Sequence, residues 1–470
     1  MNIILILCDD MGHWSMGCAG NSEIQTPNLD RMAASGMRFE NFFCASPVCS
    51  PARASVLTGK IPSQHGVHDF IDNKLKDDLE YLKGQTTYVN VLTQNGYTCG
   101  ISGKWHLGNA MERQMGFSHW YVYHSAMAPY YNAPMIRNGE AVTDEGYLTD
   151  LLTDDAIGFI QANAKKTFYL SVHYTAPHAP WLNCHPKEYL DIYDNCPFDS
   201  IPNEPKHPLQ ITTHPWPEGE ERRETLKGYF AAVTAMDAGI GKILDTLDDT
   251  GLSEDTLVFF MSDNGMNMGH HGIFGKGNGT FPMNLYDTSV KVPAIAYHPG
   301  TIPPGMVSDS LLSQYDFMPT ILDYANIKGP DASALPGKSF AATLKGSDDG
   351  SNESIVVYDE YGPVRMIRTH EWKYIHRYPY GFHELFDLVN DPGEKENLYN
   401  DETKAHIVEE MRAKLDSWFV KYVDPKMDGA REPVTGWGQM NLPGIYGKGA
   451  KAFHQSQEDI LKSRGLKSLY

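Results

Sequence analysis

Short runs of apolar residues alternate along the chain with longer amphipathic stretches. The short runs are compact and bounded by turn-forming residues, a pattern typical of buried strands. Strands are predicted at residues 3–7, 98–102, 168–173, 256–262 and 292–297, and helices at 28–35, 149–162, 224–248 and 311–325. This alternation predicts an α/β fold with a large, mostly parallel sheet between helices, whose ligand sites lie beyond the carboxyl ends of the strands.

The pattern changes at the polar, turn-rich segment 346–353, which we interpret as a domain boundary. Three short apolar runs follow closely, at 355–358, 364–368 and 373–376, and we expect an antiparallel sheet with a helix over 402–423. We therefore predict a large α/β domain over residues 1–345 and a smaller α+β subdomain over residues 354–470. From Asp424 onward the chain is rich in glycine, proline and aromatic residues, and the pattern predicts no element there.

Composition and charge narrow the range of partners. The 470 residues carry 39 Lys and Arg against 59 Asp and Glu, a formal net charge of -20. Such a field repels a phosphate backbone and an anionic membrane, so we expect neither nucleic acid nor membrane as a partner. The first apolar stretch, 3–8, is too short for a membrane span and lacks the features of a signal peptide, so we expect a cytoplasmic location. The 7 cysteines are thinly spread, which argues against a disulfide framework.

Oxygen-bearing side chains follow two of the predicted strands directly. Asp9 and Asp10 come after the first strand, and Asp263 and Asn264 come after the strand at 256–262. Adjacent buried carboxylates repel each other unless a cation neutralises them, although Asp10 could also cap a helix in an ordinary turn. If the two strands are neighbours, the four side chains converge, and an all-oxygen set favours calcium or magnesium over zinc.

A cysteine begins the segment CSPARASVLTGK, residues 49–60. Pro51 suits the first turn of a helix, so Cys49 is expected at a helix N-terminus, where backbone N–H groups favour negative charge. Arg53, one turn further on, adds a positive fork for an oxyanion. Taken alone, a single cysteine before a helix is more often a small buried thiol.

These motifs resemble the signature of the type I sulfatases, members of the alkaline-phosphatase superfamily, in which the cysteine of Cys-x-Pro-x-Arg is converted to formylglycine. Further segments match in the family's order over nearly the whole chain: GKWHLG (103–108), APHAP (176–180), SDNG (262–265), GHHGIFGK (269–276) and ELFDLVNDPGEKENL (384–398). The resemblance implies a large mixed, mostly parallel sheet sandwiched by helices, with a smaller C-terminal antiparallel sheet. Ala52 stands where serine is commoner, which leaves open the maturation enzyme that would act.

The family's calcium site transfers residue by residue. By resemblance, the metal ligands are Asp9, Asp10, Asp263 and Asn264, and the hydrated formylglycine at Cys49 completes the shell. One hydroxyl of the hydrate would attack sulfur, and the second would re-form the aldehyde as sulfate leaves. The resemblance also implies that Arg53 fixes the nucleophile and its loop.

The resemblance implies four more residues around the sulfate and a fifth beside them. Lys104 would contact the sulfate and His106 the formylglycine hydroxyl, and the two would point to one side of an extended segment. His178, on a stiff loop after a strand, would donate a proton to the leaving alcohol. Lys276 would bind sulfate oxygens, and His271 would contact the substrate or support its ligands.

A sulfated saccharide, cut at a terminal sugar, is the substrate that the family resemblance favours. Aromatic faces with polar rims suit sugar rings, although many such aromatics serve only for packing. The candidate residues in loops beside the motifs are Trp14, Trp105, Trp181, Tyr130, Tyr131, His13, His65, His68 and Asp69, with Arg365 or His370 closing the pocket. The expected partners are therefore a small sulfated substrate and a formylglycine-generating maturation enzyme.

Other activities stay open at this point. An arylsulfatase for small aryl sulfates would share the same motifs. Phosphonate monoester or phosphodiester hydrolases of the superfamily share Cys-x-Pro-x-Arg but have Asp-His in place of Asp263-Asn264. A zinc phosphatase would need more His and Asp ligands and a Ser or Thr nucleophile. A non-catalytic anion-binding protein would be expected to have lost motif residues that this chain keeps.

Overall fold

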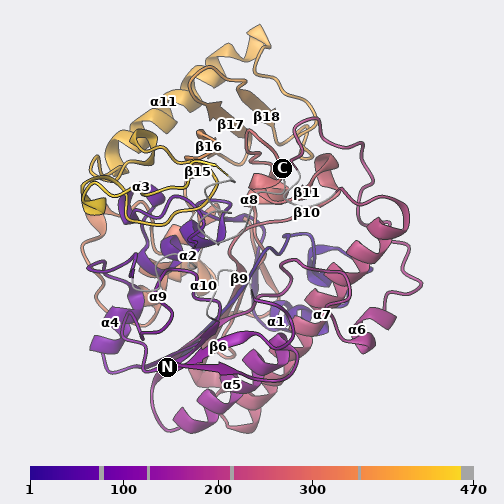
Figure 1. Ribbon diagram of the computed structural model, residues 1–470, viewed down its shortest axis with the longest axis vertical. Helices are drawn as coiled ribbons and strands as arrows, with labels where there is room; N and C mark the ends of the chain where they lie inside the picture. The colour runs from indigo at the N-terminus through magenta and orange to yellow at the C-terminus, as the bar shows by residue number, and fades with distance from the viewer. Residues whose placement is uncertain (73–78, 124–127, 212–215, 348–350, 457–470) are drawn as a thin grey trace.

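A ten-stranded mixed sheet forms the centre of the protein, seen in a computed structural model that describes residues 1–72, 79–123, 128–211, 216–347 and 351–456 (Figure 1). Its strand order is β13-β2-β12-β9-β1-β8-β4-β5-β6-β7. The strands are β1 (Asn2–Cys8), β2 (Met37–Phe39), β4 (Thr98–Gly103), β5 (His119–Tyr123), β6 (Pro134–Arg137), β7 (Glu140–Thr143), β8 (Phe168–His173), β9 (Thr256–Ser262), β12 (Ala294–Tyr297) and β13 (Met306–Ser308). The five strands from β9 to β5 run parallel, and antiparallel pairs join β12, β2, β6 and β7 to this centre.

Helices cover both faces of this sheet, because successive residues of a strand point to opposite sides. Ile4 and Ile6 of β1 belong to one buried cluster, which includes side chains of α1 (Pro27–Ser35), α5 (Leu148–Asn163) and α7 (Gly219–Asp249). Ile3 and Leu5 belong to a second cluster on the other face, with α2 (Cys49–Thr58), α4 (Tyr88–Gln94) and α9 (Phe317–Tyr324). Burial on both sides explains why β1 is an uninterrupted apolar run.

Several short elements connect these layers. Four short helices are α3 (Pro62–His65), α6 (Lys187–Asp191), α8 (Asp287–Val290) and α10 (Ala341–Leu344). Two short strand pairs join β3 (Phe42–Phe43) to β14 (Leu312–Ser313) and β10 (Asn267–Met268) to β11 (Phe274–Gly275). Within the described ranges, no helix is long and apolar enough to span a membrane.

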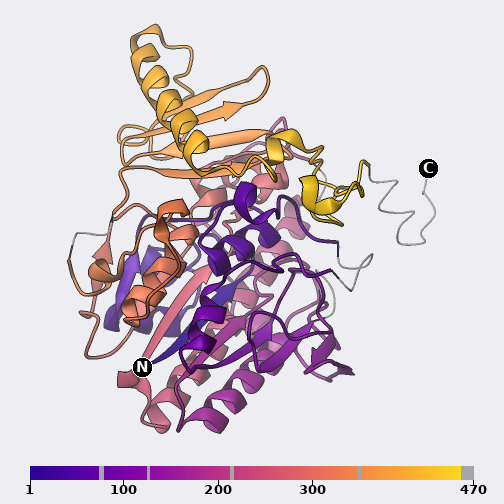
Figure 2. The same cartoon turned by 90° about the vertical axis from the view of Figure 1, so that its left-hand side faces the viewer.

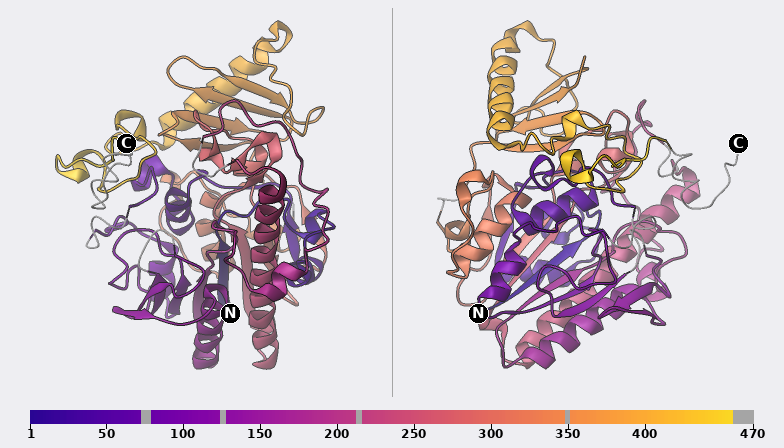
Figure 3. Two further views of the ribbon diagram at one scale, coloured as in Figure 1. Left: turned by 45° about the vertical axis from the view of Figure 1, so that its right-hand side comes forward. Right: turned by 60° about the vertical axis from the view of Figure 1, so that its left-hand side comes forward.

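A second, four-stranded antiparallel sheet lies at the top of the molecule in Figure 2, in the order β15-β16-β17-β18. Its strands are β15 (Ile355–Asp359), β16 (Val364–Arg368), β17 (Trp372–Arg377) and β18 (Glu384–Asp387). Helix α11 (Ala405–Tyr422) packs on it through Met411, Leu415 and Phe419. After α11 the chain turns back to the large sheet's side of the molecule (Figure 3).

An ion-pair cluster links this second sheet to the rest of the protein. Lys373 of β17 is fully buried, and its Nζ lies 2.5 Å from both Asp287 Oδ1 and Glu394 Oε1. Arg368 of β16 also reaches Asp287, at 3.2 Å. Charges that are buried and paired in this way lose much stability when one partner is removed.

The predicted α/β fold and the small antiparallel sheet are confirmed, and the predicted strands of the large sheet end within two residues of those observed. Two helix predictions are wrong at their starts, and the first of them, 224–248, begins five residues after the observed start of α7 at Gly219. Over 311–325 the helix α9 begins only at Phe317, because Leu312 and Ser313 pair with β3 and Ser313 then caps a 3₁₀ turn with Asp316. The hydrophobic pattern also failed to predict β18, which lies within residues 384–398, a segment identified only by its match to the family's motif. The proposed domain limits, 1–345 and 354–470, stay predictions.

Candidate active site

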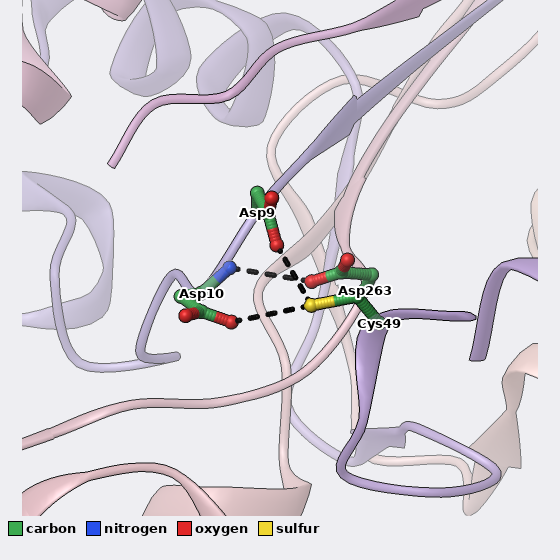
Figure 4. Close-up of side chains that lie close together, drawn as sticks. All are labelled: Asp9, Asp10, Cys49 and Asp263. Carbon is green, nitrogen blue, oxygen red and sulfur yellow. Dashed lines mark hydrogen bonds between the residues drawn. The ribbon is translucent and has the colours of Figure 1, made fainter. Parts of the chain in front are cut away.

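The carboxyl ends of β1 and β9 meet the first turn of α2 at one buried point. β1 and β9 are parallel neighbours with Cys8 paired to Ser262, so the residues that follow them lie side by side. Cys49, the first residue of α2, faces the same point. One ligand atom from each of Asp9, Asp10, Cys49 and Asp263 lies within 4.8 Å of the others. Figure 4 shows the four side chains gathered at this point.

Backbone geometry turns these side chains toward one another. The Asp263 amide donates to Cys8 O at 3.0 Å, which continues the strand pairing by one residue. Asp10 has a φ of 62°, in the left-handed region that non-glycine residues seldom adopt. Its amide donates to Asp263 Oδ1 at 3.2 Å, and the Asn264 amide nitrogen donates to Asp10 Oδ1 at 2.6 Å. The convergence predicted from the two strand ends is therefore observed.

Three cationic side chains surround the carboxylates. Nε and Nη2 of Arg53 lie 3.0 and 2.9 Å from Asp263 Oδ2. Lys276 Nζ lies 2.5 Å from Asp10 Oδ1, and Lys104 forms an ion pair with Asp9. Arg53 is 1% exposed, and its contacts with Asp263 fix the position of that carboxylate.

The charges of this cluster are unevenly compensated. Burial alone would raise the pKa of Asp9, but Lys104, His178 and Arg53 together hold it well below its ordinary value. Burial and then the charge of Asp9 raise the pKa of Asp263 to about 7, although Arg53 is in contact with it. The cations of the site therefore stabilise the ionised form of Asp9 more fully than that of Asp263.

The Cys49 thiol is buried among these groups, with 4% of the residue exposed. Its Sγ lies 3.2 Å from Asp9 Oδ1 and 2.8 Å from Lys276 Nζ. Burial, followed by the charge of Asp9, raises the pKa of the thiol well above its ordinary value. Because the thiolate is the nucleophilic form of cysteine, the unmodified side chain is poorly suited to attack here.

His178 faces the cluster from the loop after β8. Its Nδ1 lies 2.6 Å from Ala179 O, and since a carbonyl can only accept, Nδ1 carries a proton in this contact. Its Nε2 lies 3.5 Å from Asp10 Oδ2, with 12% of the side chain exposed. The ring thus presents Nε2 to the site.

The expectation of an extended segment around Lys104 and His106 is wrong. β4 ends at Gly103, and His106 has a φ of 54°, so the side-to-side alternation of a strand does not apply. The ring of His106 instead donates through Nε2 to Ile71 O at 3.1 Å. Nδ1 of this buried ring has no hydrogen-bond partner among the described residues.

The donor set fits a hard divalent cation. Three carboxylates and the amide oxygen of Asn264 are available, all on residues that are at most 1% exposed. Calcium and magnesium prefer oxygen ligands of this kind. A divalent cation would also relieve the repulsion between Asp9 and Asp263 that burial intensifies. The residues present therefore suit the metal that the family resemblance implies.

Most of the predicted sugar-binding aromatics are engaged in packing. Trp105, Trp181 and Tyr130 are buried, Trp14 donates to Met266 O at 2.9 Å, and Tyr131 is 42% exposed. The polar candidates are also engaged: His65 contacts Ser55, His68 contacts Met427 O, and Asp69 accepts from backbone amides.

The remaining candidates lie apart from the cluster. His271 stacks on Tyr286 at 3.8 Å and lines a cavity of 340 Å³ with His13 and Arg368. Arg365 pairs with Glu360 at 2.9 Å, and His370 is exposed beside α11. The contacts that the described residues make do not join any of these to the carboxylates.

Two supporting residues were missed in the sequence. His173 ends β8, and its Nδ1 lies 2.9 Å from Lys104 O and 3.4 Å from Arg53 Nη1. The side chain of Gln314 donates to Ser262 O at 3.0 Å and Asp263 O at 2.8 Å. His173 could have been found, since it ends a predicted strand at the same sheet edge, whereas no local pattern marks Gln314.

Comparison with known proteins agrees with this geometry. Residues 1–327 match the family model described as Sulfatase, and residues 269–421 match that of the N-sulphoglucosamine sulphohydrolase C-terminal region. An N-acetylglucosamine-6-O-sulfatase from Bacteroides thetaiotaomicron is 28% identical, over 91% of this chain and 88% of that one. An N-acetylgalactosamine-6-sulfatase from Mus musculus is 33% identical, over 73% of this chain and 66% of that one. A solved structure in complex with its substrate D-glucosamine-2-N,6-O-disulfate superposes with a TM-score of 0.79 at 25% identity, covering 92% of this chain and 99% of that chain.

Proposed function

Since the chain belongs to the sulfatase family and is a sulfuric ester hydrolase, we propose that it removes sulfate from a terminal sugar of a sulfated saccharide, with formylglycine at position 49 and a calcium ion. The observation that carries this proposal is a buried cluster at the ends of β1 and β9, in which Cys49 lies beside three carboxylates and two lysines.

Conversion of Cys49 would solve a chemical problem of the site. A thiol whose pKa is raised by burial and by Asp9 is held in its unreactive form. The hydrate of formylglycine would supply a hydroxyl nucleophile at the same position, at the N-terminus of α2. The intact Cys49, Pro51 and Arg53 of the motif support this proposal.

The cationic side chains would receive the sulfate group. The Nζ atoms of Lys104 and Lys276 pair with Asp9 and Asp10, the carboxylates that lie beside position 49. Arg53 would keep Asp263 in place, since its Nε and Nη2 lie 3.0 and 2.9 Å from Asp263 Oδ2. His178, protonated on both ring nitrogens, would give the Nε2 proton to the departing oxygen and keep the one that it shares with Ala179 O.

Calcium is the proposed metal, with magnesium as the alternative. The residues that would hold it are Asp9, Asp10, Asp263, Asn264 and the converted Cys49. When bound, the ion would polarise sulfate oxygens and lower the pKa of the hydrate hydroxyl. A zinc phosphatase is disfavoured, because it would need additional His and Asp ligands, and the described part of the chain holds one cluster of candidate ligands.

The proposal of a saccharide substrate is inferred from proteins that are similar to this chain. Enzymes named for N-acetylglucosamine and N-acetylgalactosamine 6-sulfates are similar to this chain, and so is the structure bound to a sulfated glucosamine. An arylsulfatase activity on small aryl sulfates is the second candidate, since arylsulfatase A from Homo sapiens is 30% identical over 84% of this chain. Asn264, where phosphonate hydrolases resembling the family have histidine, argues against that third activity.

Two experiments test the proposal. Peptide mass spectrometry of active protein should show the Cys49 peptide lighter than encoded and reactive with hydrazide probes. Fully active protein with only unmodified cysteine would contradict the formylglycine assignment, and Cys49→Ala should lose essentially all turnover.

A screen of defined sulfated mono- and disaccharides beside nitrophenyl sulfate and a phosphonate monoester tests the substrate. Turnover of nitrophenyl sulfate with none of any saccharide would refute the glycan assignment alone.

A further inference from the structure

The chain beyond α11 runs back along the segment that follows the nucleophile helix. We call residues 423–456 the C-terminal segment, shown in yellow in Figure 2 beside α2 and α3. Its hydrogen bonds to residues 61–72 include Asp424 N to Ser63 O (2.9 Å), His68 Nε2 to Met427 O (2.8 Å) and Gly438 N to Asp69 Oδ2 (3.1 Å). The sequence pattern predicted no element here, yet the segment makes specific long-range contacts.

Gln439 lies at the centre of these contacts and is fully buried. Its side chain donates to Gly66 O at 2.8 Å and to Asn441 O at 2.9 Å, and it accepts from the His68 amide at 2.8 Å. Its backbone donates to Phe70 O at 2.7 Å and accepts from the Asp72 amide at 3.0 Å. Buried amides that are satisfied this fully fix the backbone they contact.

The backbone that Gln439 holds is the backbone that contacts His106. Ile71 O accepts from His106 Nε2 at 3.1 Å. The Ile71 amide donates to Ser50 Oγ at 3.1 Å, and Ser50 Oγ donates to His106 O at 2.9 Å. Ile71 therefore joins His106 to Ser50, the residue next to Cys49, and pairs with Gln439 through an isolated bridge.

This arrangement selects one form of the His106 ring. A carbonyl oxygen can only accept, so the contact with Ile71 O places the ring proton on Nε2. Nδ1 is then the nitrogen with a lone pair, and it lacks a hydrogen-bond partner among the described residues although the residue is 4% exposed. A second contact that fixes a histidine tautomer is a known way to prepare the opposite nitrogen.

We propose that Gln439 is a positioning residue for the reaction, which acts through residues 66–72 to keep Ile71 O on His106 and so leaves Nδ1 free to accept a proton. The inference rests on the proposed function, because the proton would come from the free hydroxyl of the formylglycine hydrate after its other hydroxyl has attacked sulfur and released the alcohol. The O–H bond breaks and N–H forms, the O–H electron pair becomes the second bond of the aldehyde, and sulfate leaves with the electrons of its C–O bond.

The test compares two glutamines of the C-terminal segment in the formylglycine form. Gln439→Met keeps the length of the side chain and removes its amide. Gln455→Met is the matched control, because Gln455 is exposed and its side chain contacts Phe453 O and His454 O in the same segment. For nitrophenyl sulfate we expect kcat to fall roughly 10- to 100-fold in Gln439→Met with KM within about threefold, as for outer partners of a site histidine. The control should match the wild type.

Hydrogen exchange provides the readout that does not depend on turnover. In Gln439→Met, exchange should rise in peptides that cover residues 66–72 and also in those that cover 103–108, around His106. An unchanged 103–108 peptide would overturn the proposed coupling. A faster exchange with unchanged kcat would also overturn it, since the contact would then be only structural.

A double substitution separates an effect through His106 from general damage. In a His106→Ala background, adding Gln439→Met should cost less than about twofold, because residues of one network are not additive. An equal loss in both backgrounds would overturn the proposal. If Gln439→Met does not fold, Gln439→Asn, which keeps an amide on a shorter side chain, is measured instead and should show a smaller loss of the same kind. Absence of sulfatase turnover in the wild type would count against the proposed function, and the exchange of 103–108 would still test the coupling.

Discussion

Replacing His178 by alanine tests how the leaving group departs. The backbone around His178 is fixed, because its amide donates to Thr175 O at 2.9 Å and its carbonyl accepts from Tyr130 Oη at 2.8 Å. The ring is fixed by the 2.6 Å contact of Nδ1 with Ala179 O, which leaves Nε2 facing Asp10. Alanine should therefore remove the proton donor while the loop stays in place.

The expected magnitude depends on the substrate. A positioned general acid contributes about 10²- to 10⁴-fold, which corresponds to roughly 2.7 to 5.4 kcal/mol in the barrier. A sugar alkoxide is a poor leaving group and needs the whole of this contribution, whereas nitrophenolate leaves without a proton. We expect kcat/KM for a sugar sulfate to fall about 10²- to 10⁴-fold in His178→Ala, and that for nitrophenyl sulfate by less than about tenfold.

The assay measures kcat/KM for both substrates in the wild type, His178→Ala and a control. His119→Ala is a suitable control, since His119 pairs with Asp155 at 2.8 Å and lies at the start of β5, away from the carboxyl ends of the strands. Its ratio of the two kcat/KM values should equal that of the wild type. Equal losses on both substrates in His178→Ala would refute the reasoning and move the acid role to Lys276.

Two further predictions address the metal and the joint between the sheets. Asp263→Ala should lose turnover and also bound calcium, measured by atomic emission, because it removes one of the buried oxygen ligands. The control Asp245→Ala, which alters an exposed ion pair, should keep both. Stoichiometric zinc in the wild type would contradict the oxygen-ligand argument. Lys373→Met should lower the free energy of unfolding by about 3 to 5 kcal/mol, because it leaves the buried Glu394 carboxylate without its cation and removes one of the cations that pair with Asp287. Lys395→Met, at an exposed pair, should lower it by less than about 1 kcal/mol, and similar losses for both in chemical denaturation would contradict this view.

The central sheet and the carboxylate cluster could be predicted because both follow from short-range rules. A buried parallel strand must be apolar on both faces, so β1 and β9 are visible as continuous runs. The residues after parallel neighbours lie at one edge of the sheet, and this places Asp9 beside Asp263 across 254 residues of sequence. The identity of the family came from the motifs, and the cluster geometry agrees with it.

What the sequence could not predict depends on contacts between distant segments. The start of α9 is set by the pairing of Leu312 and Ser313 with β3, which competes with the helical pattern. The left-handed φ of His106 has no local signal such as glycine at that position. Gln439 fixes residues 66–72 through hydrogen bonds across more than 360 residues, and a glycine-rich segment gives no periodicity to reveal them.

The charges of the site explain why a divalent cation belongs in the proposed function. Three carboxylates face three cationic side chains, and each cation already contacts a carboxylate. A sulfate monoester would bring one more negative charge into this buried site, where an unbalanced charge is costly. A divalent cation would leave the site positive before the ester binds and still positive afterwards. The lysines would then be free to move from the carboxylates to the sulfate, so the same ion would both hold the acidic residues together and make room for the substrate.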